Sequence, residues 1–371
     1  MSNDYYSLKK IDSKKAIYNI IIGQRANGKT YAVIEKAVKA YFKTGARTAY
    51  LRRFKEDLTS RNISELITPH LPTIEKLSKG RFNAIKYYRQ EFWFVFKNEK
   101  GEVIDQSETS VIKCFSLNTW ESAKGADNGF FSMILFDEFL TRQYYLKDEF
   151  IIFTQLLSSI IRNRDGTTIY MLANTVNKYC PYFAEMGLTN IDKMLQGSID
   201  VYRYGNSDLT VAVEYCAESG TSKKVSKYFA FDNPRLQMVT SGTWELDNYP
   251  HCPCDYDKKD ILYHAFIRFN GAIIHGEVIK YYDNYNRTVH RFVYFYQQTK
   301  PLDYDKVEVM YTDLADSNFL HCNGINKQPT KLHEMFIDLI RNHKDFYNNN
   351  ETGEIVRNWK IQNGLTNGVI R

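Results

Sequence analysis

The stretch Gly23-Gln24-Arg25-Ala26-Asn27-Gly28-Lys29-Thr30 decides the fold of this 371-residue chain. Its spacing, G-x-x-x-x-G-K-S/T, is that of the phosphate-binding loop. Residues 17–22 before it form an apolar run that predicts a buried strand, and residues 31–42 after it repeat apolar side chains at helical spacing. Strand, loop and helix in this order are the context that a phosphate loop requires. The sequence therefore predicts a nucleotide-binding α/β domain.

The residue types of the loop indicate its chemistry. When such a loop bends around a phosphate, its backbone N–H groups point at the anion, and the following helix adds the positive end of its dipole. Lys29 is expected to reach the β- and γ-phosphates of ATP, and the Thr30 hydroxyl is expected to ligate Mg²⁺. The predicted cofactors are thus ATP and Mg²⁺. The predicted nucleotide-binding residues of the loop are Gly23, Gln24, Arg25, Ala26, Asn27, Gly28, Lys29 and Thr30.

A second motif closes another apolar strand. Residues 132–136 run Ser-Met-Ile-Leu-Phe and end in Asp137 and Glu138, which is the Walker B pattern when it follows a phosphate loop. Asp137 is expected to hold Mg²⁺ through its water shell. Glu138 is expected to act as a general base or to orient the attacking water. The second acid therefore predicts hydrolysis of the nucleotide by water.

Polar residues follow two further elements. Residues 149–161 form an apolar helix that ends in Arg162-Asn163-Arg164. Either these cations satisfy the negative end of the helix dipole, or one of them is an arginine finger offered to the γ-phosphate of a neighbouring subunit. The sequence leaves both interpretations open. Asn174 follows the strand over residues 167–172, where a polar side chain can sense the γ-phosphate.

Composition narrows the class of protein. Hydrophobic residues make up 43% and charged residues 25% of the chain, as in ordinary globular proteins. The net charge of +6 permits a nucleic-acid partner without requiring one. Six scattered cysteines fit a reduced, intracellular setting, and the spacing over residues 251–254 is poor for zinc. No apolar run approaches the ~20 residues that span a bilayer, so no membrane is expected.

Changes in composition and in the predicted elements along the chain predict two domains. We expect an ATPase domain over residues 1–203, a linker or lid over 204–258 and a second domain over 259–371. The linker carries a basic segment that either is a solvated loop or touches DNA phosphates through Lys223, Lys224 and Lys227. A strong hairpin signal surrounds Asn270-Gly271, a helix is expected over residues 331–347, and the tail after Asn348 is expected to be loose.

Several motifs together resemble the genome-packaging motor ATPases of phi-29-like tailed phages, small relatives of the terminase large subunits. The resemblance extends through about residue 185. The residues that carry it are Ile22–Thr30, Tyr50-Leu51-Arg52-Arg53-Phe54-Lys55, Trp120-Glu121-Ser122-Ala123-Lys124, Leu135-Phe136-Asp137-Glu138-Phe139, Ile161-Arg162-Asn163-Arg164, Ala173-Asn174 and Pro181-Tyr182-Phe183.

The resemblance implies a P-loop ATPase domain of the ASCE type with a mostly parallel central sheet. A smaller α+β domain with a nuclease-inactive, RNase H-like fold would follow. It also implies a homo-oligomeric ring, a pentamer, at the portal vertex of a prohead in the cytoplasm of the infected bacterium. Such a ring threads double-stranded DNA inward and, in some members, docks on a packaging RNA.

The resemblance also assigns roles to single residues. Arg162 matches the trans-acting finger, with Arg164 as the alternative, and Lys124 assists across the same subunit interface. Arg52 matches an arginine near the phosphates, and Lys55 matches a lysine that faces DNA in the pore.

The sequence itself bears on nuclease activity. A two-metal nuclease needs carboxylates that hold two ions ~4 Å apart. The first hairpin strand offers His264, Arg268 and Asn270 instead, with Glu277 on the returning strand and Asp313 and Asp316 later, so no DNA cleavage is expected.

Two other functions compete with a DNA translocase. A nucleoside or nucleotide kinase also carries a phosphate loop, but it needs no acid such as Glu138 to activate water. A nucleotide switch that does not hydrolyse ATP would likewise have no use for Glu138 as a base.

Overall fold

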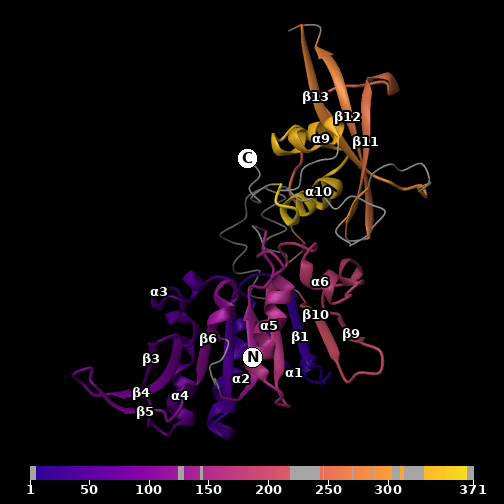
Figure 1. The fold of residues 1–371 in the computed structure, drawn as a ribbon. Coiled ribbons are helices and arrows are strands. Elements are labelled where there is room, and N and C mark those ends of the chain that lie inside the picture. Colours follow the sequence, from indigo (N-terminus) through magenta and orange to yellow (C-terminus); the bar gives the residue numbers. More distant parts are fainter. Residues whose placement is uncertain are drawn as a thin grey trace. The chain divides into compact units, whose positions relative to one another are not determined.

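The computed structural model describes residues 6–123, 129–142, 145–217, 243–244, 246–269, 271–283, 285, 287–302, 310–312 and 330–365. The chain divides into two compact units (Figure 1). The first comprises residues 1–141 and 148–245, and the second comprises residues 142–147 and 246–371. Across the described residues, no helix is both long and apolar enough to cross a membrane.

The first unit is built on a ten-stranded sheet with the order β3-β4-β6-β2-β7-β8-β1-β10-β9, and β5 pairs with β4. The six strands from β6 to β10 in this order are mutually parallel. The mostly parallel sheet predicted from the sequence is confirmed. The strands are β1 (Tyr18–Gly23), β2 (Arg47–Arg52), β3 (Ala84–Tyr88), β4 (Glu91–Lys97), β5 (Val103–Gln106), β6 (Ile112–Ser116), β7 (Phe131–Asp137), β8 (Thr168–Asn174), β9 (Ile199–Arg203) and β10 (Thr210–Tyr215).

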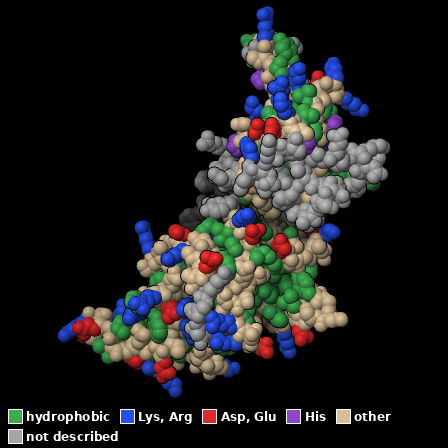
Figure 2. All heavy atoms as spheres, in the orientation of Figure 1, with side chains coloured by type: hydrophobic (Ala, Val, Ile, Leu, Met, Phe, Trp, Pro, Cys, Tyr) green, Lys and Arg blue, Asp and Glu red, His purple; other side chains and the backbone are tan. Residues whose placement is uncertain are grey.

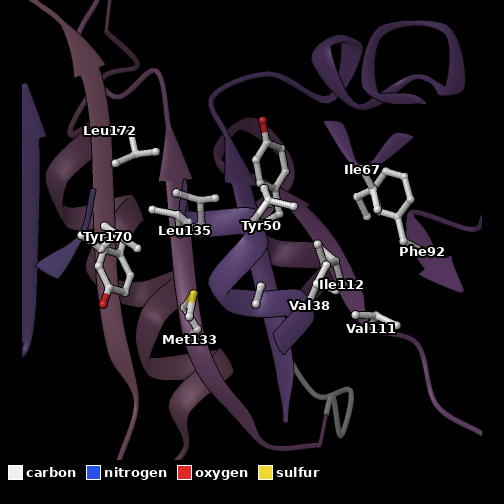
Figure 3. Close-up of a cluster of buried hydrophobic side chains, with 14 of the residues drawn as sticks. Val38, Tyr50, Ile67, Phe92, Val111, Ile112, Met133, Leu135, Tyr170 and Leu172 are labelled. Atoms are coloured by element: carbon white, nitrogen blue, oxygen red, sulfur yellow. The ribbon is translucent and has the colours of Figure 1, made fainter. Parts of the chain in front are cut away.

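Helices cover this sheet. They are α1 (Lys9–Asp12), α2 (Lys29–Thr44), α3 (Ser60–Ile63), α4 (Leu71–Leu77), α5 (Glu149–Ile161) and α6 (Pro181–Glu185). α2 lies across β2, β7 and β8. Its buried Val38 belongs to the same core cluster as Tyr50, Leu135 and Leu172, which come from those three strands (Figure 3). Burial of each such aliphatic side chain stabilises the fold by about 1.5–3 kcal/mol, so the core fixes the helix that begins at the phosphate loop.

Strand order places the motifs at one edge of the sheet. β8 lies between β1 and β7, and all three strands are parallel. Their carboxyl ends are therefore neighbours, and these ends are Gly23, Asn174 and Asp137. Ligands of open α/β sheets bind at this edge.

The second unit is an α+β structure. Its five-stranded sheet has the order β14-β11-β12-β13-β15, in which β11, β12 and β13 form an antiparallel meander. Phe336 of α9 packs on Phe295 of β13, and Trp359 of α10 packs on Tyr311 of β14. The predicted smaller α+β domain is confirmed, and its RNase H-like character stays a prediction. The elements are β11 (Ile261–Phe269), β12 (Ala272–Asp283), β13 (Thr288–Gln297), β14 (Met310–Thr312), β15 (Asp345–Tyr347), α9 (Lys331–Arg341) and α10 (Asn350–Gln362).

The predicted domain boundaries need correction. β10 pairs in parallel with β1, and β9 pairs with β10, so residues 210–215 complete the sheet of the first unit instead of forming a linker after residue 203. The second unit resumes at Leu246, before the predicted residue 259. Tyr249 belongs to it because its hydroxyl donates a 2.6 Å hydrogen bond to Glu354 of α10.

The segment after the two acids also joins the second unit. Arg142 donates hydrogen bonds to Asp247 (2.6 Å) and Glu354 (3.0 Å), and Arg357 donates one to the Arg142 carbonyl. Arg142, four residues after Glu138 in the chain, is thus part of the second unit.

The expected helix over residues 331–347 and the loose tail are wrong in detail. α9 ends at Arg341, and the chain turns at His343, whose φ of 55° is left-handed. The tail after Asn348 forms α10 because Asn349 caps it by accepting the Thr352 N–H, and because its apolar side chains, including Trp359, are buried.

Candidate active site

Two glycines let the phosphate loop take its shape for different reasons. Gly28 has a φ of 90°, which strains any residue with a side chain. At Gly23 the limit is space, because a Cβ there would lie 2.8 Å from the Cβ of Cys216, just after β10. The buried Asn27 side chain accepts the Lys29 N–H at 3.2 Å and so ties the loop to the start of α2.

Lys29 lies buried inside the loop. Its Nζ donates to the Gln24 carbonyl (2.7 Å) and the Gly23 carbonyl (3.3 Å), and it reaches Asn174 Oδ1 on the neighbouring strand end at 3.4 Å. Burial lowers the pKa of the Lys29 ammonium to about 8, against the opposing attraction of Cys216 and Asp137. The ammonium is therefore a buried charge that an incoming triphosphate would stabilise.

The predicted metal ligands meet at the same edge. Thr30 Oγ1 lies 3.3 Å from both carboxylate oxygens of Asp137, and the Tyr50 hydroxyl donates to Asp137 Oδ2 at 3.3 Å. Burial raises the pKa of the Asp137 carboxyl, although Arg52 opposes this shift. A hydroxyl beside a buried carboxylate is the all-oxygen donor set that Mg²⁺ prefers, and a bound cation would favour the ionised carboxylate. These two residues therefore fit the ion.

Glu138 directly follows Asp137, and its backbone is in the left-handed conformation, with a φ of 57°. Arg52 Nη2 donates to its Oε2 at 2.6 Å, and Arg52 Nε lies 3.6 Å from Asp57. The Glu138 side chain is 58% exposed, which leaves the carboxylate accessible to water. Arg52 thus contacts the predicted base instead of the phosphate loop, and its predicted contact with phosphate stays a prediction.

A buried ion pair that the sequence did not predict supports this edge. Arg53 Nε lies 2.8 Å from Glu149 Oε2, and Arg53 also donates to the carbonyls of Glu138 and Phe139. Tyr182 donates to the same carboxylate at 2.9 Å. Removing one partner of such a pair typically costs about 3–5 kcal/mol, so the pair holds the acids and the start of α5 in place. The only local sign of it is the arginine that directly follows β2.

A cavity of about 270 Å³ joins these groups. Three predicted loop residues do not line the cavity. Gly23 and Gln24 instead accept hydrogen bonds from Lys29 through their carbonyls, and Arg25 is exposed. Tyr31, Ala173 and the Asp137 partner Tyr50 were not predicted as site residues. The lining consists of Ala26, Asn27, Gly28, Lys29, Thr30, Tyr31, Asp137, Glu138, Ala173 and Asn174.

The two candidate finger arginines lie away from this cavity. α5 begins beside the acids, and its 13 residues carry the chain about 20 Å along the sheet. Thr167, which follows the arginines, donates to the carbonyl of Phe131 at the opposite end of β7 from Asp137. Arg162 and Arg164 therefore lie toward the amino edge of the sheet, out of reach of their own phosphate loop.

Some predicted site residues lie elsewhere. Lys55 is exposed at the start of a 3-10 helix (Lys55–Leu58), where its N–H bonds to Asn118. The other predicted lysines lie outside the described residues, and they are Lys124, Lys223, Lys224 and Lys227.

The pKa of Lys29 makes nucleotide affinity depend on pH. Above pH 8 the free protein loses the Lys29 proton, whereas a bound triphosphate would retain it, so ATP binding takes up a proton. We expect the Kd for ATP to rise with pH above about 8, by up to tenfold per pH unit. Titration with a fluorescent ATP analogue in several buffers checks this. An affinity that stays constant through this range would contradict a buried, proton-coupled Lys29.

Comparison with known proteins agrees with these features. The sequence model of the family described as Podovirus DNA encapsidation protein (Gp16) matches residues 2–219. The DNA packaging proteins of Bacillus phages PZA and phi29 are each 27% identical to the chain over 183 residues, which are 48% of this chain and 49% of each relative. The chain thus spans about half the length of the curated relatives it matches.

A solved structure supports the fold over nearly the whole length. The bacteriophage Phi-29 viral genome packaging motor assembly aligns with 98% of this chain and 99% of that chain, with a TM-score of 0.52 and 18% identity. The phosphate loop, the paired acids and the match over more than half of the sequence lead to one conclusion: the chain belongs to the podovirus Gp16 DNA encapsidation family.

Proposed function

We propose that this chain is an ATP-hydrolysing translocase that packages double-stranded DNA into a phage prohead. The observation that carries the proposal is the meeting of Lys29, Thr30, Asp137, Glu138 and Asn174 around one cavity at the carboxyl edge of the sheet. In this proposal Lys29 binds the β- and γ-phosphates and Asn174 senses the γ-phosphate. Family membership supports DNA as the load.

The residues present would hold Mg²⁺ through Thr30 and Asp137, and the ion would neutralise charge that develops on the transferred phosphoryl group. Glu138 accepts a proton from the attacking water, and Arg52, which bonds to Oε2 of its carboxylate, positions the base. Because Arg142 is anchored to α10, a shift of the peptide after Glu138 would reach the second unit through the chain.

The proposed partners follow from the family. They are double-stranded DNA, the portal protein, further copies of this chain in a pentameric ring and a packaging RNA, at the prohead in the host cytoplasm. On the face drawn in Figure 2, acidic and basic side chains of the first unit are interspersed. The proposed DNA contacts lie in loops such as that of Lys55. Because they would be made to phosphates, DNA binding should weaken steeply with salt.

The fate of the γ-phosphate tests the proposal. We expect assembled rings supplied with ATP and Mg²⁺ alone to yield inorganic phosphate, because Glu138 lines the cavity beside Asp137. Release of phosphate without any acceptor is measured with a coupled phosphate assay. A kinase would instead consume ATP only with a nucleoside or nucleotide present, and a switch would bind ATP without turnover. Either of those outcomes would contradict the proposal.

A further inference from the structure

Three potential metal ligands converge on the second unit, far along the chain from the ATP site. His264 of β11 is the cross-strand partner of Glu277 of β12, and His275 lies two residues before Glu277 on the same face. Within the described residues, one ligand atom from each of the three lies within 4.8 Å of the others. The neighbouring side chains Tyr263 and Ala265 point to the opposite, buried face, where Tyr263 contacts Phe336 of α9. The cluster therefore occupies the sheet face opposite to α9.

A chain of hydrogen bonds fixes the protons of this cluster. The Tyr296 hydroxyl donates to Glu277 Oε1 at 3.0 Å, so its oxygen is the acceptor for His275 Nδ1 at 2.6 Å. With its proton on Nδ1, His275 keeps a lone pair on Nε2, which lies 2.9 Å from His264 Nδ1. Metal-binding histidines typically donate their other ring N–H in this way, because that bond orients the ring and fixes the tautomer.

Hydrogen bonds also orient the Glu277 carboxylate, as they orient the His275 ring. Glu277 is buried, and its second oxygen accepts from the Tyr256 hydroxyl at 2.7 Å. His264 is 52% exposed, so its far nitrogen can take the proton when Nδ1 binds a cation. One ligand thus faces solvent and two are held by tyrosines.

The spacing suits one transition-metal ion. Tetrahedral Zn²⁺ with bonds of about 2.0–2.1 Å places its ligand atoms about 3.4 Å apart. His264 Nδ1 lies 2.9 Å from His275 Nε2 and 3.7 Å from Glu277 Oε1, and these distances bracket that value. Imidazole nitrogens favour Zn²⁺ over Mg²⁺, whereas a single carboxylate does not support a two-metal nuclease centre.

We propose that His264, His275 and Glu277 bind one Zn²⁺ ion on the exposed face of the second sheet, with a fourth position open to water. Tyr296 and Tyr256 are positioning residues that orient two of the ligands. The site is independent of the ATP cavity and of the proposed translocase activity.

Titration of the full chain with Co²⁺ tests the site, because a cobalt ion in a Zn²⁺ site gives visible ligand-field absorption. Excess Mg²⁺ and the absence of nucleotide keep Co²⁺ from the ATP site. We expect one equivalent to bind and Zn²⁺ to displace it. His275→Ala should abolish the absorption, and His264→Ala should weaken binding at least tenfold. Tyr296→Phe should weaken it about 10–100-fold.

Matched controls make the test decisive. His290 lies on β13 of the same sheet with a similar exposure, 56%, so His290→Ala should bind Co²⁺ as the wild type does. Cys252→Ser tests for binding through a thiol and should also leave the titration unchanged. The exposed His264 tolerates alanine, and equal thermal unfolding of the metal-free proteins checks folding. Absence of saturable binding, or equal binding by His264→Ala, would overturn the proposal and leave a hydrogen-bond network alone.

Discussion

Glu138→Gln should reduce the rate of ATP hydrolysis by about 10²–10⁴-fold, the usual contribution of a positioned general base. The carboxylate lines the cavity beside Asp137 and is accessible to water, whereas glutamine keeps its shape but cannot accept the proton. ATP binding should persist, because Lys29 and Thr30 are unchanged. Steady-state phosphate release and equilibrium binding of a fluorescent ATP analogue measure the two properties separately.

Asp57→Asn is the matched control. Asp57 also lies near Arg52 but is not among the residues that line the nucleotide cavity. We expect its substitution to change turnover only a few-fold. If Glu138→Gln retains near wild-type turnover, or if both variants lose activity equally, the assignment of Glu138 as the base is wrong.

Arg162→Ala should reduce ATP hydrolysis by about 10³–10⁵-fold in assembled rings if Arg162 is the trans-acting finger. The arginine lies toward the edge of the sheet opposite to its own cavity, so only a neighbouring subunit's nucleotide is available to it. Mixing Arg162→Ala with Glu138→Gln protein should restore activity, because some interfaces then combine an intact base with an intact arginine. Turnover measured across mixing ratios checks this.

The variant Arg164→Ala separates the two candidates. If the arginines only complement the α5 dipole, either alanine variant should lose at most about 1 kcal/mol of stability and keep its turnover. Failure of every mixing ratio to restore activity would argue against a finger at Arg162.

Local pattern was enough to predict the centre of the site. The phosphate loop needs a strand before it and a helix after it, and both formed as β1 and α2. Asp137 and Asn174 could be brought to the same edge because parallel strands share their carboxyl ends. These predictions depend on the order of strand, loop and helix around the motifs, which can be followed along the sequence.

The features that the sequence did not predict depend on contacts between distant segments. The Arg53–Glu149 pair joins residues 96 positions apart. β6 pairs in parallel with β2 on one side and in antiparallel with β4 on the other, so it joins the parallel part of the sheet to its antiparallel edge.

The most direct test of the account is ATP turnover at low salt, with and without linear double-stranded DNA, for wild type and Glu138→Gln. A DNA translocase should show turnover that DNA stimulates in the wild type and not in the variant, and the stimulation should decline as salt weakens the phosphate contacts. Turnover that is indifferent to DNA at every salt concentration, in rings assembled on the portal, would contradict a DNA translocase.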